Sequence, residues 1–273
     1  MGLFKNNYND SGSGVSKKAP QKKTFFRFFD AFTNKFWTLF KINLIYFLFC
    51  IPIVTFGPAT AAMTTLMRNI YLQRPQFIFH DFWEAFKRNF KKSLVIGIVD
   101  VIAICLAVYS YFFYTLNMEY NDSIWFMYAL TMAAEVIFLM MNFFIYPQIV
   151  ALNLGMPAIL KNSLILAFVN IKGNLVSLAG FIVYALLFLF FTPIMAILTP
   201  LLPFAWLGLI TMFGCYPAIQ KFIINPFYEA QGEKNPEIPD YEENEDEAVF
   251  EDKGGEEAPI ILSKSEKKGR IIK

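Results

Sequence analysis

The stretch SLVIGIVDVIAICLAVYSYFFYTL, residues 93–116, decides the fold, because it is apolar almost throughout and carries a single charge, Asp100. About 20 consecutive apolar residues are enough for a helix to cross the hydrocarbon core of a bilayer. A second stretch of this kind follows at residues 124–151, and two more occupy residues 175–197 and 201–224. The sequence therefore predicts an all-α membrane protein.

The composition supports this class. The 273 residues are 56% hydrophobic and 17% charged, with a mean hydropathy of +0.44, whereas soluble domains carry about 25% charged residues. The polar residues gather at the two ends: residues 1–23 are polar, and residues 229–273 are first acidic and then basic. We therefore expect a helical membrane domain over residues 24–228, between two disordered cytosolic tails.

The segment that precedes these spans contains a turn signal and a weakly apolar stretch. Residues 36–56 predict a first span that Pro52 kinks, and Gly57-Pro58 predicts a sharp turn after it. Residues 58–72 are only mildly apolar, but their small side chains suit close helix packing in lipid. These small residues are Ala59, Ala61, Ala62, Thr64 and Thr65. We expect residues 58–72 either to cross the membrane or to form a deep re-entrant hairpin with the first span.

Three other segments predict short helices beside the spans. Phenylalanines recur at spacings of three and four over residues 25–36, which is typical either of an amphipathic interfacial helix or of the first turns of the following span. Residues 77–92 place aromatic side chains on one face and basic ones on the other, a pattern that suits an anionic membrane surface. Pro157 begins a third short helix, also amphipathic, within residues 153–174.

The distribution of positive charge predicts the topology. All 24 lysines and arginines fall in four blocks, which are residues 5–41, 68–92, 161–172 and 221–273. The connections at residues 57–58, 117–123 and 193–203 contain none. Because lysine and arginine collect in cytosolic loops near span ends, we expect about six transmembrane helices in a cell membrane, with both termini cytosolic. A re-entrant hairpin in place of the first two crossings would leave every basic block on the same side.

Three ionisable residues are predicted at membrane depth: Arg68, Asp100 and Glu135. A charge at that depth is costly and marks a candidate functional site. We expect the three to form one buried polar cluster. It would serve either as a site for a proton, a cation or a polar substrate, or as a salt bridge that locks helix packing, with Arg68 alternatively snorkelling to the surface.

No catalytic set is recognisable in the sequence. His80 is the single histidine, which excludes a metal site that needs two histidines. The sequence has no zinc-protease, phosphate-loop or nucleophile-elbow motif. We therefore expect a non-enzymatic protein without catalytic residues, a metal site or a cofactor. The lipid bilayer is an expected partner and nucleic acid is not.

Three strings resemble the bacterial YesL family, over residues 30–228 in all. They are FCIPIVTFGPATAA at residues 49–62, FWEAFKRNF at residues 82–90 and LKNSL at residues 160–164. Members of that family are integral membrane proteins of undefined biochemical role, and their genes often accompany those of carbohydrate ABC transporters, sensor kinases and glycoside hydrolases. The resemblance implies a bacterial cell membrane and a link to sugar uptake, and it carries over no catalytic residue.

Two functions remain as expectations. The first is an accessory or regulatory role in carbohydrate uptake, in which the protein contacts an ABC transporter permease or an associated sensor kinase. The alternative is that the bundle itself transports a small solute or ion through the polar residues at membrane depth.

Overall fold

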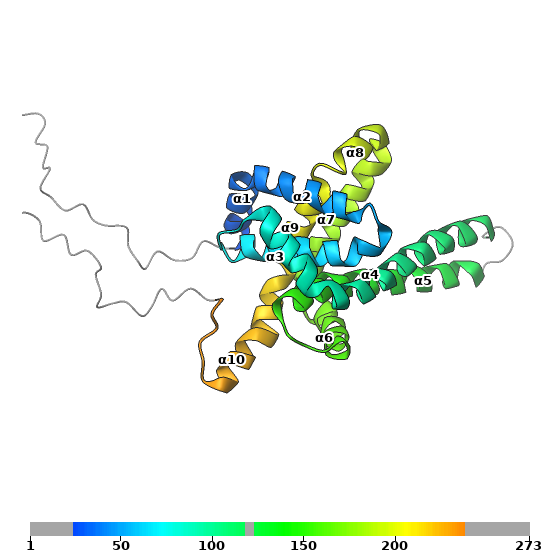
Figure 1. Ribbon diagram of the computed structural model, residues 1–273. Coiled ribbons are helices and arrows are strands. Elements are labelled where there is room, and N and C mark those ends of the chain that lie inside the picture. The colour runs from blue at the N-terminus through cyan, green and yellow to red at the C-terminus, as the bar shows by residue number, and fades with distance from the viewer. Residues whose placement is uncertain (1–23, 118–122, 238–273) are drawn as a thin grey trace, which may run out of the picture. The chain divides into compact units, whose positions relative to one another are not determined.

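The computed structural model describes residues 24–117 and 123–237, and within these ranges it consists of helices and short connections without strands. Figure 1 shows these helices. The all-α class predicted from the sequence is confirmed. The predicted tail at residues 1–23, the middle of the connection at 117–123 and residues 238–273 lie outside the described residues.

The described elements follow one another along the chain as a series of helices of very different length. They are α1 (Thr24–Asn34), α2 (Phe36–Cys50), the short 3-10 turn η1 (Ile53–Thr55), α3 (Phe56–Tyr71), α4 (Ile78–Asn117), α5 (Ser123–Ala151), α6 (Met156–Val169), α7 (Ile171–Phe190), α8 (Thr192–Leu198), α9 (Pro203–Ile219), the π-helical turn η2 (Gln220–Ile224) and α10 (Asn225–Gln231). The short helix predicted to begin at Pro157 is present as α6, which begins one residue earlier, at Met156. It is not amphipathic, because apolar side chains lie on its exposed face as well as on its buried one.

Four helices are long and apolar enough to cross a membrane: α4, α5, α7 and the continuous helical stretch from α9 to α10. The two helices in the region of the first two predicted spans are shorter, with 15 residues in α2 and 16 in α3. At a rise of about 1.5 Å per residue, both helices are shorter than the hydrocarbon core, which is about 30 Å thick. A helical membrane bundle is thus confirmed, and four of the six predicted crossings have spanning length.

α3 lies at the centre of the core. Twelve of its 16 residues are buried, and it packs against α2, α4, α5 and α9. Ala59, Ala61 and Ala62 are fully buried, so the close packing predicted from the small residues is confirmed. A segment that is only mildly apolar occupies the centre because small side chains allow neighbouring helices to approach it on several sides.

The first predicted span ends earlier than expected, at Cys50, because Pro52 cannot continue the helix. Pro52 adopts an extended conformation (φ −78°, ψ 110°) and starts the η1 turn. The Thr55 hydroxyl then donates hydrogen bonds to the carbonyls of Phe49, at 2.5 Å, and Pro52, at 2.7 Å. This side chain gives a partner to the Phe49 carbonyl, which the end of α2 leaves free; the Pro52 carbonyl also accepts from the backbone N–H of Thr55, at 2.9 Å.

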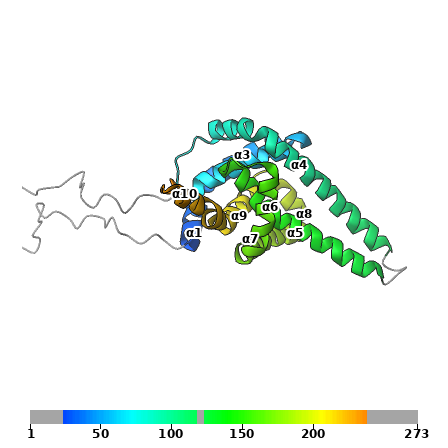
Figure 2. The same cartoon turned by 90° about the horizontal axis from the view of Figure 1, so that it is seen from below.

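α4 merges two elements that the sequence predicted separately. The amphipathic segment at residues 77–92 and the span at 93–116 form one helix of 40 residues, which is prominent in Figure 2. The amphipathic character is confirmed, but protein covers part of the aromatic face: Phe82 is fully buried, and its ring lies 5.2 Å from that of Phe49 in α2. Lys87 and Arg88 on the other face are exposed.

Two helix crossings depend on glycine. A Cβ atom on Gly97 of α4 would stand 2.5 Å from the Cα atom of Gly57 in α3, and a Cβ on Gly57 would stand 2.0 Å from the Ser93 carbonyl oxygen. At the second crossing, a Cβ on Gly173 of α7 would stand 2.0 Å from the carbonyl oxygen of Gly214 in α9. The backbones therefore touch at both places, as small residues permit in membrane bundles.

The later half of α4 and the first half of α5 run side by side away from the core (Figures 1 and 2). Their outward side chains are large, apolar and exposed, with Ile102 53% and Trp125 61% accessible. An apolar surface of this extent on a spanning pair is what a lipid phase covers.

Asn43 fastens α2 to the beginning of α9. Its side chain is fully buried. The amide nitrogen donates to the carbonyls of Thr199, at 3.1 Å, and Pro200, at 2.8 Å, and the amide oxygen accepts from the backbone N–H of Ala205 at 2.8 Å. One side chain therefore gives partners to three backbone groups that have no partner in a helix ladder.

Replacing Asn43 by leucine, which has a similar volume, is expected to lower the free energy of unfolding by about 2–3 kcal/mol, because buried backbone groups lose their partners. Denaturant titration in detergent measures this loss. The control is Asn117→Leu, since the Asn117 amide donates to the Phe113 carbonyl within its own helix. Equal losses in the two variants would contradict the assigned role of Asn43.

Candidate functional site

The three ionisable residues predicted at membrane depth do not come together. Arg68 forms an ion pair with Glu237, Asp100 accepts hydrogen bonds from α5, and Glu135 accepts one from α4. Within residues 24–117 and 123–237, no hydrogen bond or ion pair links any two of the three. Each is therefore considered separately.

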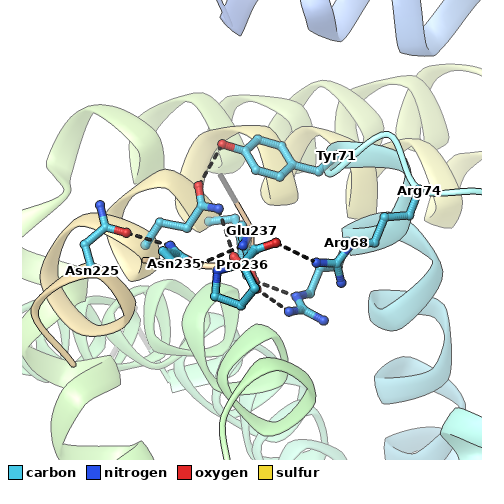
Figure 3. Close-up of polar contacts among 9 residues, drawn as sticks. Arg68, Tyr71, Arg74, Asn225, Asn235, Pro236 and Glu237 are labelled. Atoms are coloured by element: carbon cyan, nitrogen blue, oxygen red, sulfur yellow. Dashed lines mark hydrogen bonds and ion pairs between the residues drawn. The ribbon is translucent and has the colours of Figure 1, made fainter. Parts of the chain in front are cut away.

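Arg68, near the end of α3, has the most extensive polar surroundings (Figure 3). Its Nε atom donates to the hydroxyl of Tyr216 at 2.5 Å, and its Nη2 atom pairs with the carboxylate of Glu237. The side chains of Arg68 and Glu237 are only 15% and 6% exposed. The pair is thus shielded from water. Charge-assisted hydrogen bonds are stronger in such buried surroundings than in water.

Three donors from three elements converge on the Glu237 carboxylate. Besides Arg68, the Tyr216 hydroxyl donates to Oε1 at 2.8 Å and lies 3.0 Å from Oε2, and the amide of Gln220 donates to Oε2 at 2.9 Å. Both carboxylate oxygens are therefore engaged. We name Arg68, Tyr216 and Gln220 the Arg68 site.

The local sequence explains how α9 and the adjoining turn η2 supply two of these donors. Tyr216 and Gln220 are four residues apart and so share a helix face. Pro217 lies inside α9, and the π-helical turn η2 begins at Gln220; turns of this kind interrupt α-helices frequently at functional sites. Tyr71 donates to the Oε1 atom of Gln220 at 3.2 Å, which leaves the amide nitrogen facing Glu237.

Glu237, whose carboxylate occupies the Arg68 site, lies on the loop that follows α10. That helix ends at Gly232, which has φ 70°, a left-handed conformation that suits glycine. Asn235 then donates to Asn225 at 2.7 Å and accepts from the backbone N–H of Glu237 at 2.9 Å. The structure thus describes the chain as far as Glu237, eight residues beyond residue 229, where the sequence predicted the tail to begin.

Electrostatics hold Glu237 in its charged form. Burial alone raises the pKa of this carboxyl, but the Arg68 guanidinium, with hydrogen bonds from Gln220 and Tyr216, outweighs burial and holds the pKa below its usual value of 4.5. The Arg68 site thus binds an anionic carboxylate at neutral pH.

Asp100 is buried between α4 and α5, at 6% exposure. Its carboxylate accepts from the amide of Asn142 at 2.9 Å and from the hydroxyl of Tyr146 at 2.5 Å. Both donors are neutral. The Oδ1 atom of Asn142 is also buried and has no hydrogen-bond partner among the described residues, so this site keeps one acceptor for a further donor or cation.

Glu135 lies in the hairpin of α4 and α5 and is half-buried. It accepts a hydrogen bond from the Ser110 hydroxyl at 3.0 Å, and Tyr114 and Thr131 form a second cross-helix contact at 3.3 Å. These contacts join two apolar helices side by side, and this arrangement favours the structural interpretation of Glu135.

Two other features limit what the described residues can hold. Groups of three or more histidine, cysteine, aspartate or glutamate side chains that could bind a metal ion do not occur among them. An open groove of about 610 Å³ between α5 and α7 is lined chiefly by apolar side chains, among them Leu139, Leu178 and Phe181. Its chemistry suits hydrocarbon better than a polar solute.

Comparison with known proteins identifies one similarity. Residues 31–111 match a family described as "Protein of unknown function, DUF624". This segment holds α2, α3 and most of α4, and therefore Arg68 and Asp100 but not Tyr216 or Glu237. It also contains two of the three strings that resemble the YesL family. The chain has no significant match among curated proteins or among solved structures.

Proposed function

We propose that this protein is a non-enzymatic bacterial membrane protein that assists or regulates carbohydrate uptake through an ABC transporter permease or an associated sensor kinase. The observation that carries the proposal is the Arg68 site. It binds Glu237, a member of the acidic run at residues 229–257, to α3 and α9, and the acidic side chains of this run are candidate contacts for a partner protein. The link to carbohydrate uptake comes from the YesL resemblance.

The proposal places both termini in the cytosol. The four basic blocks support this orientation, and so does the contact of Gly57 with Ser93, which directly follows Lys91 and Lys92. The turn between α2 and α3 therefore lies beside a basic segment, a position that favours a re-entrant hairpin over two full crossings. Four crossings, by α4, α5, α7 and α9, then keep every basic block on one side.

Cysteine labelling tests this orientation. In a chain whose native cysteines are replaced, Asn117→Cys at the end of α4 is expected to react with a membrane-impermeant maleimide in whole cells. Lys87→Cys, on the exposed basic face of α4, is expected to react only in inside-out vesicles. The opposite pattern would contradict the orientation.

Affinity purification tests the partner. The chain, tagged at its N-terminus and expressed at native level, is purified from its own membrane in mild detergent, with an unrelated multi-pass protein as the control. We expect a carbohydrate permease or sensor-kinase subunit to be enriched at least tenfold over the control. If neither kind of subunit is enriched, the accessory role is rejected.

A second candidate function, transport of a small ion by the bundle, is favoured by one observation. Asp100 is a buried carboxylate bonded to neutral donors, next to an acceptor that lacks a protein partner, and such residues in membrane helices frequently belong to ion or proton paths. Flux into proteoliposomes is expected to be lost in Asp100→Asn and kept in Glu135→Gln. Sealed vesicles in which the unmodified chain gives no flux would exclude transport of the ions tested.

A further inference from the structure

We propose that the Arg68 site is an exchangeable receptor for carboxylates of acidic peptide segments, and that Glu237 is its internal occupant. This inference concerns what the site binds and does not depend on the role in carbohydrate uptake.

The site is built without help from its occupant. Tyr216 is fully buried in α9, and Arg68 donates directly to its hydroxyl. Tyr71 orients the Gln220 amide, and the Arg27 guanidinium in turn donates to the Tyr71 carbonyl at 2.7 Å. All these contacts join residues of the helical bundle, so the donors are already aimed at the place of the carboxylate, and binding requires little reordering.

The occupant is attached differently. Glu237 stands on a loop that begins at a left-handed glycine, Gly232, and the hydrogen bonds of Asn235 join α10 to the loop itself. Arg74 reaches the Pro236 carbonyl only at 3.5 Å. The carboxylate of Glu237 is thus the strong attachment of the loop to α3 and α9. A loop whose strongest described contact with α3 and α9 is one carboxylate can leave without disturbing these helices.

Charge explains why the site would not stay empty. Arg68 lies on a rigid helix and is largely buried, so departure of Glu237 leaves a cation inside the protein without its ion-pair partner, an unfavourable state. Another carboxylate restores the pair. The donors bond both oxygens of the carboxylate, so the recognised group is the aspartate or glutamate side chain of an acidic peptide.

The covalent tether of Glu237 determines how well a free peptide can compete for the Arg68 site. Glu237 is tethered within a few residues of α10 and therefore acts at a high effective concentration, so a free peptide binds only when this tether is removed or the site is vacated. We therefore expect almost no peptide binding to the unmodified protein and measurable binding when Glu237 is substituted.

The test uses the full-length chain in nanodiscs and a fluorescent peptide with the sequence of residues 232–244. The peptide is expected to bind the Glu237→Gln chain at least tenfold more tightly than it binds the unmodified chain or the doubly substituted chain E237Q/R68Q. A peptide that carries glutamine at the position of Glu237 should lose at least tenfold in affinity. Equal binding to all three chains, or no binding to Glu237→Gln, would overturn the proposal.

A second preparation guards against loss of stability in Glu237→Gln. A protease site inserted after Gly232 allows the loop to be cut from the folded, otherwise unmodified chain, which empties the site while Arg68, Tyr216 and Gln220 remain. The cut chain is expected to bind the peptide as Glu237→Gln does, with glutarate as a competitor and sulfate at equal ionic strength without effect. If the cut chain does not bind the peptide, the site does not recognise carboxylates. The same conclusion follows if sulfate displaces the peptide as effectively as glutarate does.

Discussion

Gly97→Leu is expected to prevent the membrane domain from folding, with a loss of more than about 3 kcal/mol in the free energy of unfolding. The reason is the contact of two backbones: a Cβ atom on Gly97 would meet the Cα atom of Gly57 at 2.5 Å and its nitrogen at 2.6 Å. Backbone atoms inside packed helices cannot rotate away as side chains do, so α3 and α4 must separate. Because α3 packs against α2, α4, α5 and α9, separating α3 from α4 also exposes buried side chains of the other helices.

The alanine variants make this expectation quantitative. Gly97→Ala is expected to destabilise strongly, whereas Gly180→Ala in α7 is its matched control, since there a Cβ would meet only side-chain atoms, the nearest on Ile210 at 3.3 Å. Alanine also has the higher helix propensity, by about 1 kcal/mol, so Gly180→Ala should be neutral or stabilising. Denaturant titration and the monodisperse fraction in detergent measure both variants. Equal behaviour would show that the crossing of α3 and α4 tolerates a side chain.

Hydropathy located the long helices well because a span is a local property of the sequence. The predicted span at residues 124–151 corresponds to α5 (Ser123–Ala151), and the apolar half of α4 ends within one residue of the predicted boundary at 116. The re-entrant alternative for residues 36–72 comes from the positions of the four basic blocks. The fusion of residues 77–92 with the next span was missed, because the change from amphipathic to apolar sequence does not require a break in the helix.

The polar site could not be predicted in the same way, because its partners depend on which helices cross. Arg68, Asp100 and Glu135, which the sequence predicts at membrane depth, each have a polar partner in the structure. Their partners, however, are neutral side chains or lie on segments far along the chain. Glu237 is one of 13 carboxylates in residues 229–257, and nothing in that run distinguishes it.

One sequence pattern that the predictions did not use lies beside both carboxylate sites. Tyrosine precedes proline near the ends of two helices, at Tyr146-Pro147 in α5 and Tyr216-Pro217 in α9. In the structure both tyrosines donate to a buried or half-buried carboxylate, Tyr146 to Asp100 and Tyr216 to Glu237. A buried hydroxyl in an otherwise apolar helix needs a partner, so these two pairs could have indicated that polar side chains lie nearby.

Glu237→Gln is expected to lower the free energy of unfolding by about 2–3 kcal/mol, more than Arg68→Gln does, because the two partners have different freedom to move. Arg68 is fixed on α3 and keeps its charge inside the protein when Glu237 is neutralised. Glu237 stands on a loop and can swing into water when Arg68 is removed. Denaturant titration of both single variants and the double variant measures this asymmetry, and a larger loss in Arg68→Gln would contradict it.

The pH dependence of the same pair gives an independent measurement. The folded-state pKa of Glu237 lies below the usual value of 4.5, so the unfolded chain takes up the proton first as pH falls. The contribution of the pair is therefore complete above pH 4.5 and is lost as pH falls through the lowered folded-state value. The stability difference between the unmodified chain and Glu237→Gln should accordingly be constant from neutral pH to the usual glutamate value and shrink below it. A difference that stays constant into strong acid would mean that the carboxylate of Glu237 does not stabilise the fold through its charge.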